Sequence, residues 1–264
     1  EPAYDFLIQA MGGLMSVTGE RDDKPGGGPQ KVGVPIVDLT TGVYAALGIV
    51  AALLRRSQTG QGEYIDVAML DVQVGLLANQ AMNFLLGGRV PRRTGTAHPN
   101  IQPQRTFACA DGDIVIVVGN DAQFATLCEA LGQPSLARDP RYVSNSQRVK
   151  NLDTLDPLLD AIFIREPRAH WLDLLKRAGV PAGSINTVPE VFDDPQVQHR
   201  GMLRRLPHPV AGEVPQVMNP LRFGQSSLRV DRAPALLGQH TDEVLAELGL
   251  SAAQIQDYRD RKII

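Results

Sequence analysis

An apolar periodicity between residues 40 and 58 constrains the fold of this chain most strongly. Six apolar residues recur there at spacings of three and four: Val43, Ala46, Leu47, Val50, Leu53 and Leu54. This spacing predicts an amphipathic helix, with Thr40 or Thr41 as its N-cap and an end near the glycines of residues 59–62. Asp38 is therefore expected just upstream of the helix N-terminus.

A carboxylate in that position has two interpretations. The free N–H groups and the positive end of the helix dipole stabilise an ionised aspartate, which can act as a nucleophile toward a carbonyl carbon. Aspartate is also a preferred capping residue, so Asp38 could simply cap the helix. The local pattern leaves both open.

The next segments predict mixed helix and strand. The apolar run at residues 63–70 is typical of a strand covered on both faces, and Asp71 is expected to cap a helix that ends at residues 87–88. Residues 105–110 and 113–118 flank Asp111-Gly112 and predict a hairpin. Further helices are expected at residues 122–131, 152–164, 167–178 and 241–248 and from Ser251, with strands at 202–206 and 213–217. Ser251 and Gln254 have the spacing of a capping box.

Composition indicates an ordinary globular chain. Its 264 residues are 43% hydrophobic and 21% charged, and the net charge of −3 gives no reason to expect nucleic acid or an anionic membrane as a partner. No apolar run is expected to reach the ~20 residues of a membrane span. Cys109 and Cys128 are expected to be buried in a reducing compartment, and neither the cysteines nor the histidines have the spacing of a metal site.

Nine stretches, in collinear order, resemble family III CoA-transferases, the group that includes formyl-CoA and carnitine CoA-transferases. They are residues 4–19, 33–42, 53–71, 95–103, 110–112, 119–121, 179–183, 194–197 and 236–242. Together they extend over nearly the whole chain. Gly95-Thr-Ala-His98 and the stretch at 236–241 are most similar to the branch that uses short dicarboxylates such as succinate or glutarate.

The resemblance implies an α/β fold, with a Rossmann-like large domain and a smaller α+β domain. It implies that residues 1–90 are a core segment of the large domain, that 91–185 form the small domain, and that 186–264 return to the large domain. The N-terminal part of the family sequence is expected to be absent, because Glu1 is not a methionine and aligns with the middle of the family.

For the activity, the resemblance implies that Asp38 attacks an acyl-CoA thioester and carries covalent aspartyl intermediates. Coenzyme A thioester is then a substrate, and no tightly bound cofactor or metal is expected. The family also implies an interlocked homodimer in the cytoplasm, or in the mitochondrial matrix if the source is eukaryotic.

Two alternatives remain. Racemases of the same fold place a histidine where Tyr4 stands, and a phenol with a pKa of about 10 is a poor acid/base substitute for an imidazole near 6.5. This difference favours a transferase. The chain could also be a non-catalytic subunit or fragment. By resemblance, Ala3, Tyr4 and Asp5 are candidates for substrate and CoA binding, with a strand-end tyrosine and a capping aspartate as the alternative.

The loop containing His98 and Asn100 is expected to face the acyl group. His98 could donate a hydrogen bond to the second carboxylate of a dicarboxylate, with Arg92, Arg93 or Arg105 as charge partner, or it could only fix the loop beside Pro99. The tri-glycine at residues 26–28 lacks the context of a phosphate-binding loop and is expected to lie in a flexible surface loop. The glycine-rich lid of some family members is not reproduced here.

Overall fold

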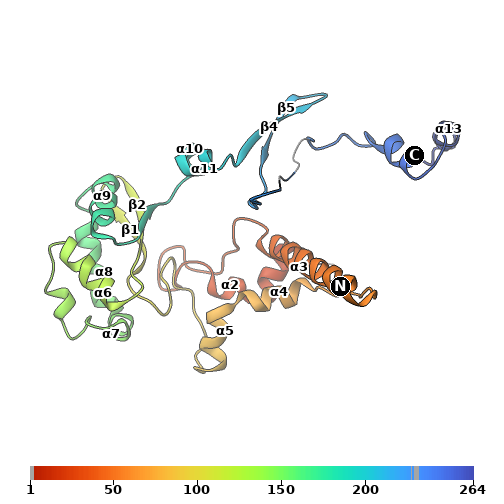
Figure 1. Cartoon of the computed structure of the whole chain (residues 1–264). Helices are drawn as coiled ribbons and strands as arrows, with labels where there is room; N and C mark the ends of the chain where they lie inside the picture. The colour runs from red at the N-terminus through yellow and green to blue at the C-terminus, as the bar shows by residue number, and fades with distance from the viewer. Residues whose placement is uncertain (1–2, 227, 229–231) are drawn as a thin grey trace. The chain divides into compact units, whose positions relative to one another are not determined.

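The computed structural model describes residues 3–226, 228 and 232–264, and the chain divides into two compact units (Figure 1). The first unit is Glu1–Ile185 and the second is Asn186–Ile264. Each unit is described by itself below. The division into three domain segments stays a prediction.

The first unit begins with five helices. Helix α1 packs against α3 and α4, and α3 packs against α4. Gly12 at the end of α1 lies so close to α4 that an added Cβ would be 2.2 Å from Gln73 Cγ. The helices are α1 (Asp5–Met11), α2 (Leu14–Val17), α3 (Ile36–Thr59), α4 (Met69–Leu76) and α5 (Ala78–Leu85).

The predicted start of the long helix is wrong by a few residues. Helix α3 begins at Ile36, so Asp38 lies in its first turn, and Thr40 donates its hydroxyl to the Ile36 carbonyl at 2.6 Å instead of capping the helix. Its N-cap is Pro35, which makes no side-chain cap bond. The helix starts early because a side chain from α1 provides the cap, a contact that local sequence does not reveal.

The predicted strand at residues 63–70 is also wrong. Residues 61–68 have no regular secondary structure, and α4 begins at Met69 with Asp71 inside its first turn instead of at its cap. A strand needs a neighbour to complete its hydrogen bonds, and the described residues place none beside this run. The apolar run therefore predicted a strand, but the structure provides no neighbouring strand in the described residues with which it could pair.

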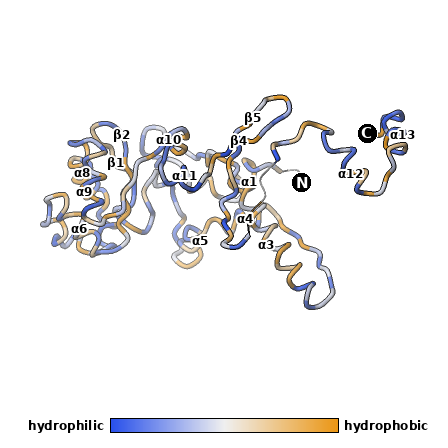
Figure 2. The backbone as a smooth tube through the Cα atoms, turned by 45° about the horizontal axis from the view of Figure 1, so that its top comes forward, coloured by the Kyte–Doolittle hydropathy of each residue, from blue (hydrophilic) through white to orange (hydrophobic). Residues whose placement is uncertain are grey.

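Helix α3 is rich in apolar residues, drawn orange in Figure 2, and many of its large apolar side chains are exposed. By length and composition it could cross a membrane, and only 6% of its most apolar stretch is buried. The expectation that no segment reaches the length of a membrane span is therefore wrong. Its exposed face contains Leu39, Val43, Tyr44, Leu47, Val50 and Leu54.

The remainder of the first unit is a small sheet with helices. Strands β1 (Gln104–Cys109), β2 (Gly112–Val117) and β3 (Ala182–Ser184) form an antiparallel sheet in that order. The hairpin is confirmed, with Ala110 and Asp111 in the turn and Gly112, at a φ of 141°, as the first residue of β2. The three predicted helices are confirmed as α6, α8 and α9, whereas β3 and the short α7 were not predicted. The helices are α6 (Asp121–Ala130), α7 (Asn145–Lys150), α8 (Leu152–Phe163) and α9 (Arg168–Ala178).

The sheet and helices enclose the main hydrophobic core. Phe163 of α8 lies between Phe107 of β1 and Trp171 of α9, with ring centroids 4.6 and 5.0 Å away. The Trp171 indole donates to the Phe163 carbonyl at 2.8 Å, so its polar atom is satisfied inside the core. Cys109 and Cys128 are both buried in this core, as predicted.

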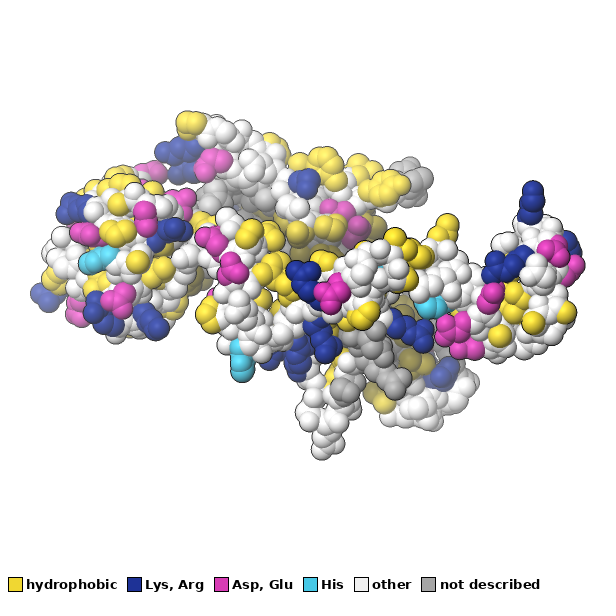
Figure 3. All heavy atoms as spheres, turned by 90° about the horizontal axis from the view of Figure 1, so that it is seen from above, with side chains coloured by type: hydrophobic (Ala, Val, Ile, Leu, Met, Phe, Trp, Pro, Cys, Tyr) yellow, Lys and Arg dark blue, Asp and Glu magenta, His cyan; other side chains and the backbone are white. Residues whose placement is uncertain are grey.

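The second unit is small. Its hairpin and last two helices agree with the prediction, including the capping box of Ser251 and Gln254. Charged side chains of both signs are interspersed on the face of the molecule drawn in Figure 3. The elements are α10 (Val188–Asp193), α11 (Pro195–His199), β4 (Leu203–His208), β5 (Gly212–Val217), α12 (Thr241–Glu247) and α13 (Ala252–Asp260).

Candidate functional site

Asp5 caps the helix that carries Asp38. One carboxylate oxygen of Asp5 accepts hydrogen bonds from the backbone N–H of Val37 at 2.8 Å and of Asp38 at 3.4 Å. Because these N–H groups have no partner inside the helix, a carboxylate is the ligand that suits them best. The capping alternative is therefore correct for Asp5, although the helix it caps is α3 and not its own.

A buried glutamine holds Asp5 in place. Gln9 is fully buried one turn along α1, and its amide N–H donates to the second Asp5 oxygen at 2.6 Å. The carbonyl oxygen of the same side chain accepts from the Val32 N–H at 2.9 Å. Asp5 and Gln9 thus fix both the start of α3 and the loop that leads into it.

Asp38 itself is exposed, and its carboxylate makes no hydrogen bond or ion pair within the described part of the chain. Since Asp5 supplies the cap, the Asp38 carboxylate is not needed to cap the helix. Tyr4 precedes α1 with 83% of its surface exposed, and Ala3 is exposed beside it. The structure therefore groups three of the predicted residues, Tyr4, Asp5 and Asp38, around the beginnings of α1 and α3.

His98 lies on a separate loop. Its Nδ1 accepts a hydrogen bond from the Asn100 N–H at 3.1 Å, and its backbone N–H donates to the Gln104 carbonyl at 2.9 Å. An Nδ1 that accepts must be unprotonated in the neutral ring, so the ring proton is on Nε2. His98 therefore presents a hydrogen-bond donor beyond its own loop.

The Asn100 side chain is already engaged. Its amide forms a reciprocal pair with Asn83 of α5, at 2.9 and 3.1 Å, and its backbone carbonyl accepts from Asn145 at 2.8 Å. This arrangement ties the His98 loop to α5 and α7. Asn100 as a binding residue stays a prediction.

Arg148 anchors the other end of this loop. It is completely buried, and its guanidinium donates to the carbonyls of Gln102 at 2.7 Å and Tyr142 at 3.0 Å and to Asp121 at 2.8 Å. Gln102 in turn donates its side-chain amide to the His98 carbonyl at 2.6 Å. The position of His98 thus depends on a buried arginine 50 residues away in the sequence.

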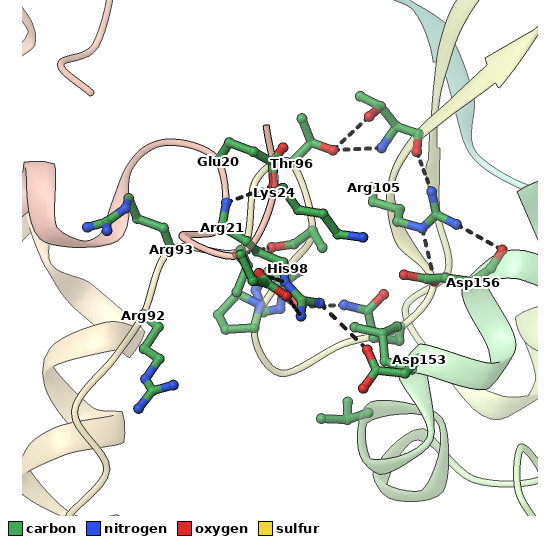
Figure 4. Close-up of a pocket in the computed structure, with 18 of the residues that line it drawn as sticks. Glu20, Arg21, Lys24, Arg92, Arg93, Thr96, His98, Arg105, Asp153 and Asp156 are labelled. Atoms are coloured by element: carbon green, nitrogen blue, oxygen red, sulfur yellow. Dashed lines mark hydrogen bonds and ion pairs between the residues drawn. The ribbon is translucent and has the colours of Figure 1, made fainter. Parts of the chain in front are cut away.

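A cavity of about 760 Å³ opens beside His98 (Figure 4). Its walls are the loop of residues 20–24, the loop of residues 92–99, the start of β1, and helices α7 and α8. A backbone hydrogen bond from Gly95 to Gly19, 3.1 Å long, joins the two loops.

Most charges on the cavity wall are paired. Arg105 bridges Asp156 and Asp160 at 3.0 and 2.7 Å, and burial raises the pKa of the Asp156 carboxyl even though Arg105 opposes this effect. Arg93 pairs with Asp22. Two of the three arginines suggested as charge partners for His98 are thus already neutralised, and only Arg92 has no ion pair among the described residues.

The sequence analysis missed the loop of residues 20–24. Arg21 pairs with Asp23 at 2.8 Å and approaches Asp153 of α8 at 3.7 Å, so this loop contacts the same cavity as His98. The only available signal was the charged run Glu20-Arg-Asp-Asp-Lys24. Such a run is usually a solvated surface, so it does not by itself indicate a site.

The predicted site residues therefore form two groups. Within the described residues, no hydrogen bond or ion pair joins Tyr4, Asp5 and Asp38 to His98 and Asn100. Nor do those residues contain a cluster of three or more His, Cys, Asp or Glu side chains that could hold a metal ion.

Comparison with known proteins identifies the chain's relatives. A family model described as CoA-transferase family III matches residues 1–241. A succinate–glutarate CoA-transferase from Agrobacterium fabrum is 42% identical over 93% of this chain and 60% of its own length. A succinyl-CoA:glutarate CoA-transferase from Homo sapiens is 39% identical over 93% of the chain and 55% of its own length.

Solved structures agree with this result. A CAIB/BAIF family protein from Brucella suis matches with a TM-score of 0.77 and 44% identity, over 94% of this chain and 63% of the other. Rv3272 from Mycobacterium tuberculosis matches with a TM-score of 0.78 and 28% identity, over 92% of this chain and 63% of the other. The predicted mixed α/β fold is confirmed. The chain spans 60% or less of the length of the Agrobacterium fabrum and Homo sapiens CoA-transferases.

Proposed function

The chain belongs to CoA-transferase family III, and from this premise we propose that the complete protein transfers coenzyme A from an acyl-CoA thioester to a carboxylic acid. Asp38 is the proposed nucleophile. The observation that carries this proposal lies at the start of α3, where Asp5 caps the helix and the Asp38 carboxylate has no partner among the described residues.

The proposed reaction has four exchanges at Asp38. The Asp38 carboxylate attacks the thioester carbonyl carbon, and the carbon–sulfur bond breaks. CoA thiolate departs, and a mixed anhydride between Asp38 and the acyl group remains. The thiolate then attacks the Asp38 carbonyl carbon, which releases the donor acid and forms an aspartyl-CoA thioester. The acceptor carboxylate displaces the thiolate to give a second anhydride, and the thiolate attacks the acceptor's acyl carbon to restore Asp38. No net proton or electron is consumed, and the activation of the thioester is conserved.

The position of Asp38 in the first turn of α3 suits this chemistry. Helix N–H groups and the helix dipole favour a negative charge there. The backbone around Asp38 is fixed by the Asp5 contact, so the nucleophile is oriented before substrate binds.

We expect the acids to be short dicarboxylates. Relatives of 39–42% identity are named for succinate and glutarate, and an acetyl-CoA:oxalate CoA-transferase from Acetobacter aceti is 41% identical over 76% of this chain and 51% of its own length. His98 supports this assignment because its Nε2–H is free to donate to a second carboxylate. In keeping with the resemblance, we also propose a homodimer, located in the cytoplasm or in the mitochondrial matrix.

Intact mass spectrometry tests the nucleophile. The complete protein, incubated with succinyl-CoA, is expected to gain the mass of an acyl or CoA adduct at Asp38, and Asp38→Ala is expected to show no adduct and no transfer while its circular dichroism is unchanged. Transfer at near parental rate in Asp38→Ala contradicts the proposal. Absence of both adduct and transfer in the parent would identify a non-catalytic subunit.

A further inference from the structure

Among the described residues, the cavity beside His98 has one cationic side chain that is directed inward and makes no ion pair. Five Lys or Arg side chains line the cavity, and Arg21, Arg93 and Arg105 all pair with aspartates. The ammonium group of Lys24 makes no hydrogen bond or ion pair within the described residues. Arg92 is likewise unpaired, but Figure 4 shows that it points away from His98.

Lys24 is held toward the cavity by its backbone. Its N–H donates to the Arg21 carbonyl at 3.1 Å, and its carbonyl accepts from the Gly27 N–H at 3.0 Å, so two consecutive turns shape this loop. Gly26 has a φ of 78°, a conformation in which glycine is favoured. From this loop the Lys24 side chain extends toward the middle of the cavity (Figure 4).

Lys24 and His98 together provide two kinds of donor. A lysine ammonium is a positive point charge with three N–H donors, and the His98 Nε2–H is a neutral donor. A group that accepts from both should be anionic and small. Carboxylates and phosphates both meet this requirement.

The charge of the wall favours a carboxylate. Six acidic residues line the cavity against five Lys and Arg residues, so the wall has no excess of positive charge with which to neutralise a phosphate dianion. Among the described residues Glu20 is the one lining carboxylate outside these ion pairs, so the inward Lys24 ammonium can neutralise at most a singly charged group. The cavity volume lies in the range of small-molecule sites.

We propose that Lys24 is the charge partner of His98 and binds the free carboxylate of a dicarboxylate acid or of its CoA monoester. This inference rests on the proposed dicarboxylate transferase function and names a specificity residue that the sequence analysis did not consider. In this arrangement Lys24 discriminates dicarboxylates from monocarboxylates, because only a dicarboxylate retains a free carboxylate after its other end has reacted.

A direct binding measurement tests the role of Lys24 independently of transferase activity. Isothermal titration calorimetry of the complete protein measures binding of glutarate, with butyrate as monocarboxylate and inorganic phosphate as competing anion. The variants are Lys24→Met, Lys24→Arg, and the control Lys150→Met, which removes an exposed positive charge on α7 that does not line the cavity. Asp38→Ala is included to remove chemistry without altering the cavity.

We expect the parent and Lys150→Met to bind glutarate equally, Lys24→Met to bind it at least tenfold more weakly, and Lys24→Arg to lie between them. Lys24→Met should weaken binding by the same factor in the Asp38→Ala background. Butyrate binding should not change. The Michaelis constant for glutarate should rise in Lys24→Met while the turnover number is retained. Equal glutarate affinity in Lys24→Met and Lys150→Met would overturn the proposal, as would phosphate binding that is tighter than glutarate binding and equally dependent on Lys24.

The outcomes also separate this inference from the proposed function. Lys24-dependent glutarate binding without any transferase activity leaves the carboxylate site standing and refutes the transferase. If transfer proceeds through Asp38 and the Michaelis constant for glutarate is the same in Lys24→Met as in the parent, the transferase stands and the Lys24 carboxylate site is refuted.

Discussion

Asp5 of one helix caps the helix that carries Asp38, through hydrogen bonds of 2.8 Å to the Val37 N–H and 3.4 Å to the Asp38 N–H. Two neighbouring acidic residues thereby have separate tasks. Asp5 satisfies the backbone N–H groups, and the Asp38 carboxylate is left without a partner among the described residues, as the proposed nucleophile requires.

Replacing Asp5 should affect stability and activity together. Asp5→Ala removes the cap and should lower the free energy of unfolding by about 1–2 kcal/mol. It should also reduce the rate at which Asp38 forms its adduct, since the first turn of α3 is released. Asp5→Asn keeps a carbonyl acceptor and should retain most of both properties. Urea unfolding and adduct formation measure the two effects, and an unchanged adduct rate in Asp5→Ala would show that the cap does not position Asp38.

Two glycines offer a matched test of the packing between α1 and α4. In Gly12→Ala the new Cβ would meet Gln73 Cγ at 2.2 Å and the Ile8 carbonyl at 2.8 Å, so we expect a destabilisation of about 1–3 kcal/mol. In Gly75→Ala, within α4, nothing lies within 4 Å of the new atom, and the higher helix propensity should stabilise by about 0.5–1 kcal/mol. Thermal unfolding gives both values, and equal effects would contradict the close helix contact.

Arg148 should be one of the most sensitive positions beside the three-stranded sheet. Arg148→Met leaves the carbonyls of Gln102 and Tyr142 without their donor, which should cost about 2–4 kcal/mol. The partner Asp121 is half exposed and can be solvated, so the carbonyls dominate the loss. As control, Arg141→Met removes an exposed arginine and should have little effect. Chemical denaturation compares the two variants, and a similar small change in both would argue against the role of Arg148.

Burial should make both cysteine thiols unreactive. In the case of Cys128 it should also lower the free energy of unfolding at alkaline pH. It raises the pKa of the Cys109 thiol, and it raises the pKa of Cys128 from an ordinary 9.0 to about 12. Between these two values the unfolded chain loses the Cys128 proton while the folded chain keeps it. The folded state then binds more protons, so the free energy of unfolding falls as the pH rises from about 9 to about 12.

Two measurements test the cysteine prediction. Iodoacetamide should label neither thiol in the native protein at pH 8 and both thiols in denaturant. Cys128→Ala should have a shallower loss of stability over the alkaline range than the parent. Rapid labelling of native Cys128, or the same alkaline slope in both proteins, would be inconsistent with a buried thiol.

The sequence by itself determined the local elements whose signals lie within a few residues. The long helix, the hairpin around Asp111-Gly112, the capping box at Ser251 and the burial of both cysteines follow from periodicity, turn chemistry and hydrophobicity. It also made Asp38 a candidate nucleophile, through the resemblance to family III and not through the local pattern alone, and that role stays a proposal.

Only the tertiary structure decided the features that depend on distant contacts. The early start of α3 requires Asp5 from another helix, and the run at residues 63–70 has no strand partner to make it a strand. The pairing of Arg93 and Arg105, the orientation of His98 through Arg148, and the approach of the Lys24 loop to the cavity all join residues far apart in sequence. A charged side chain looks the same in sequence whether it is paired or free, and only its neighbours in space determine which it is.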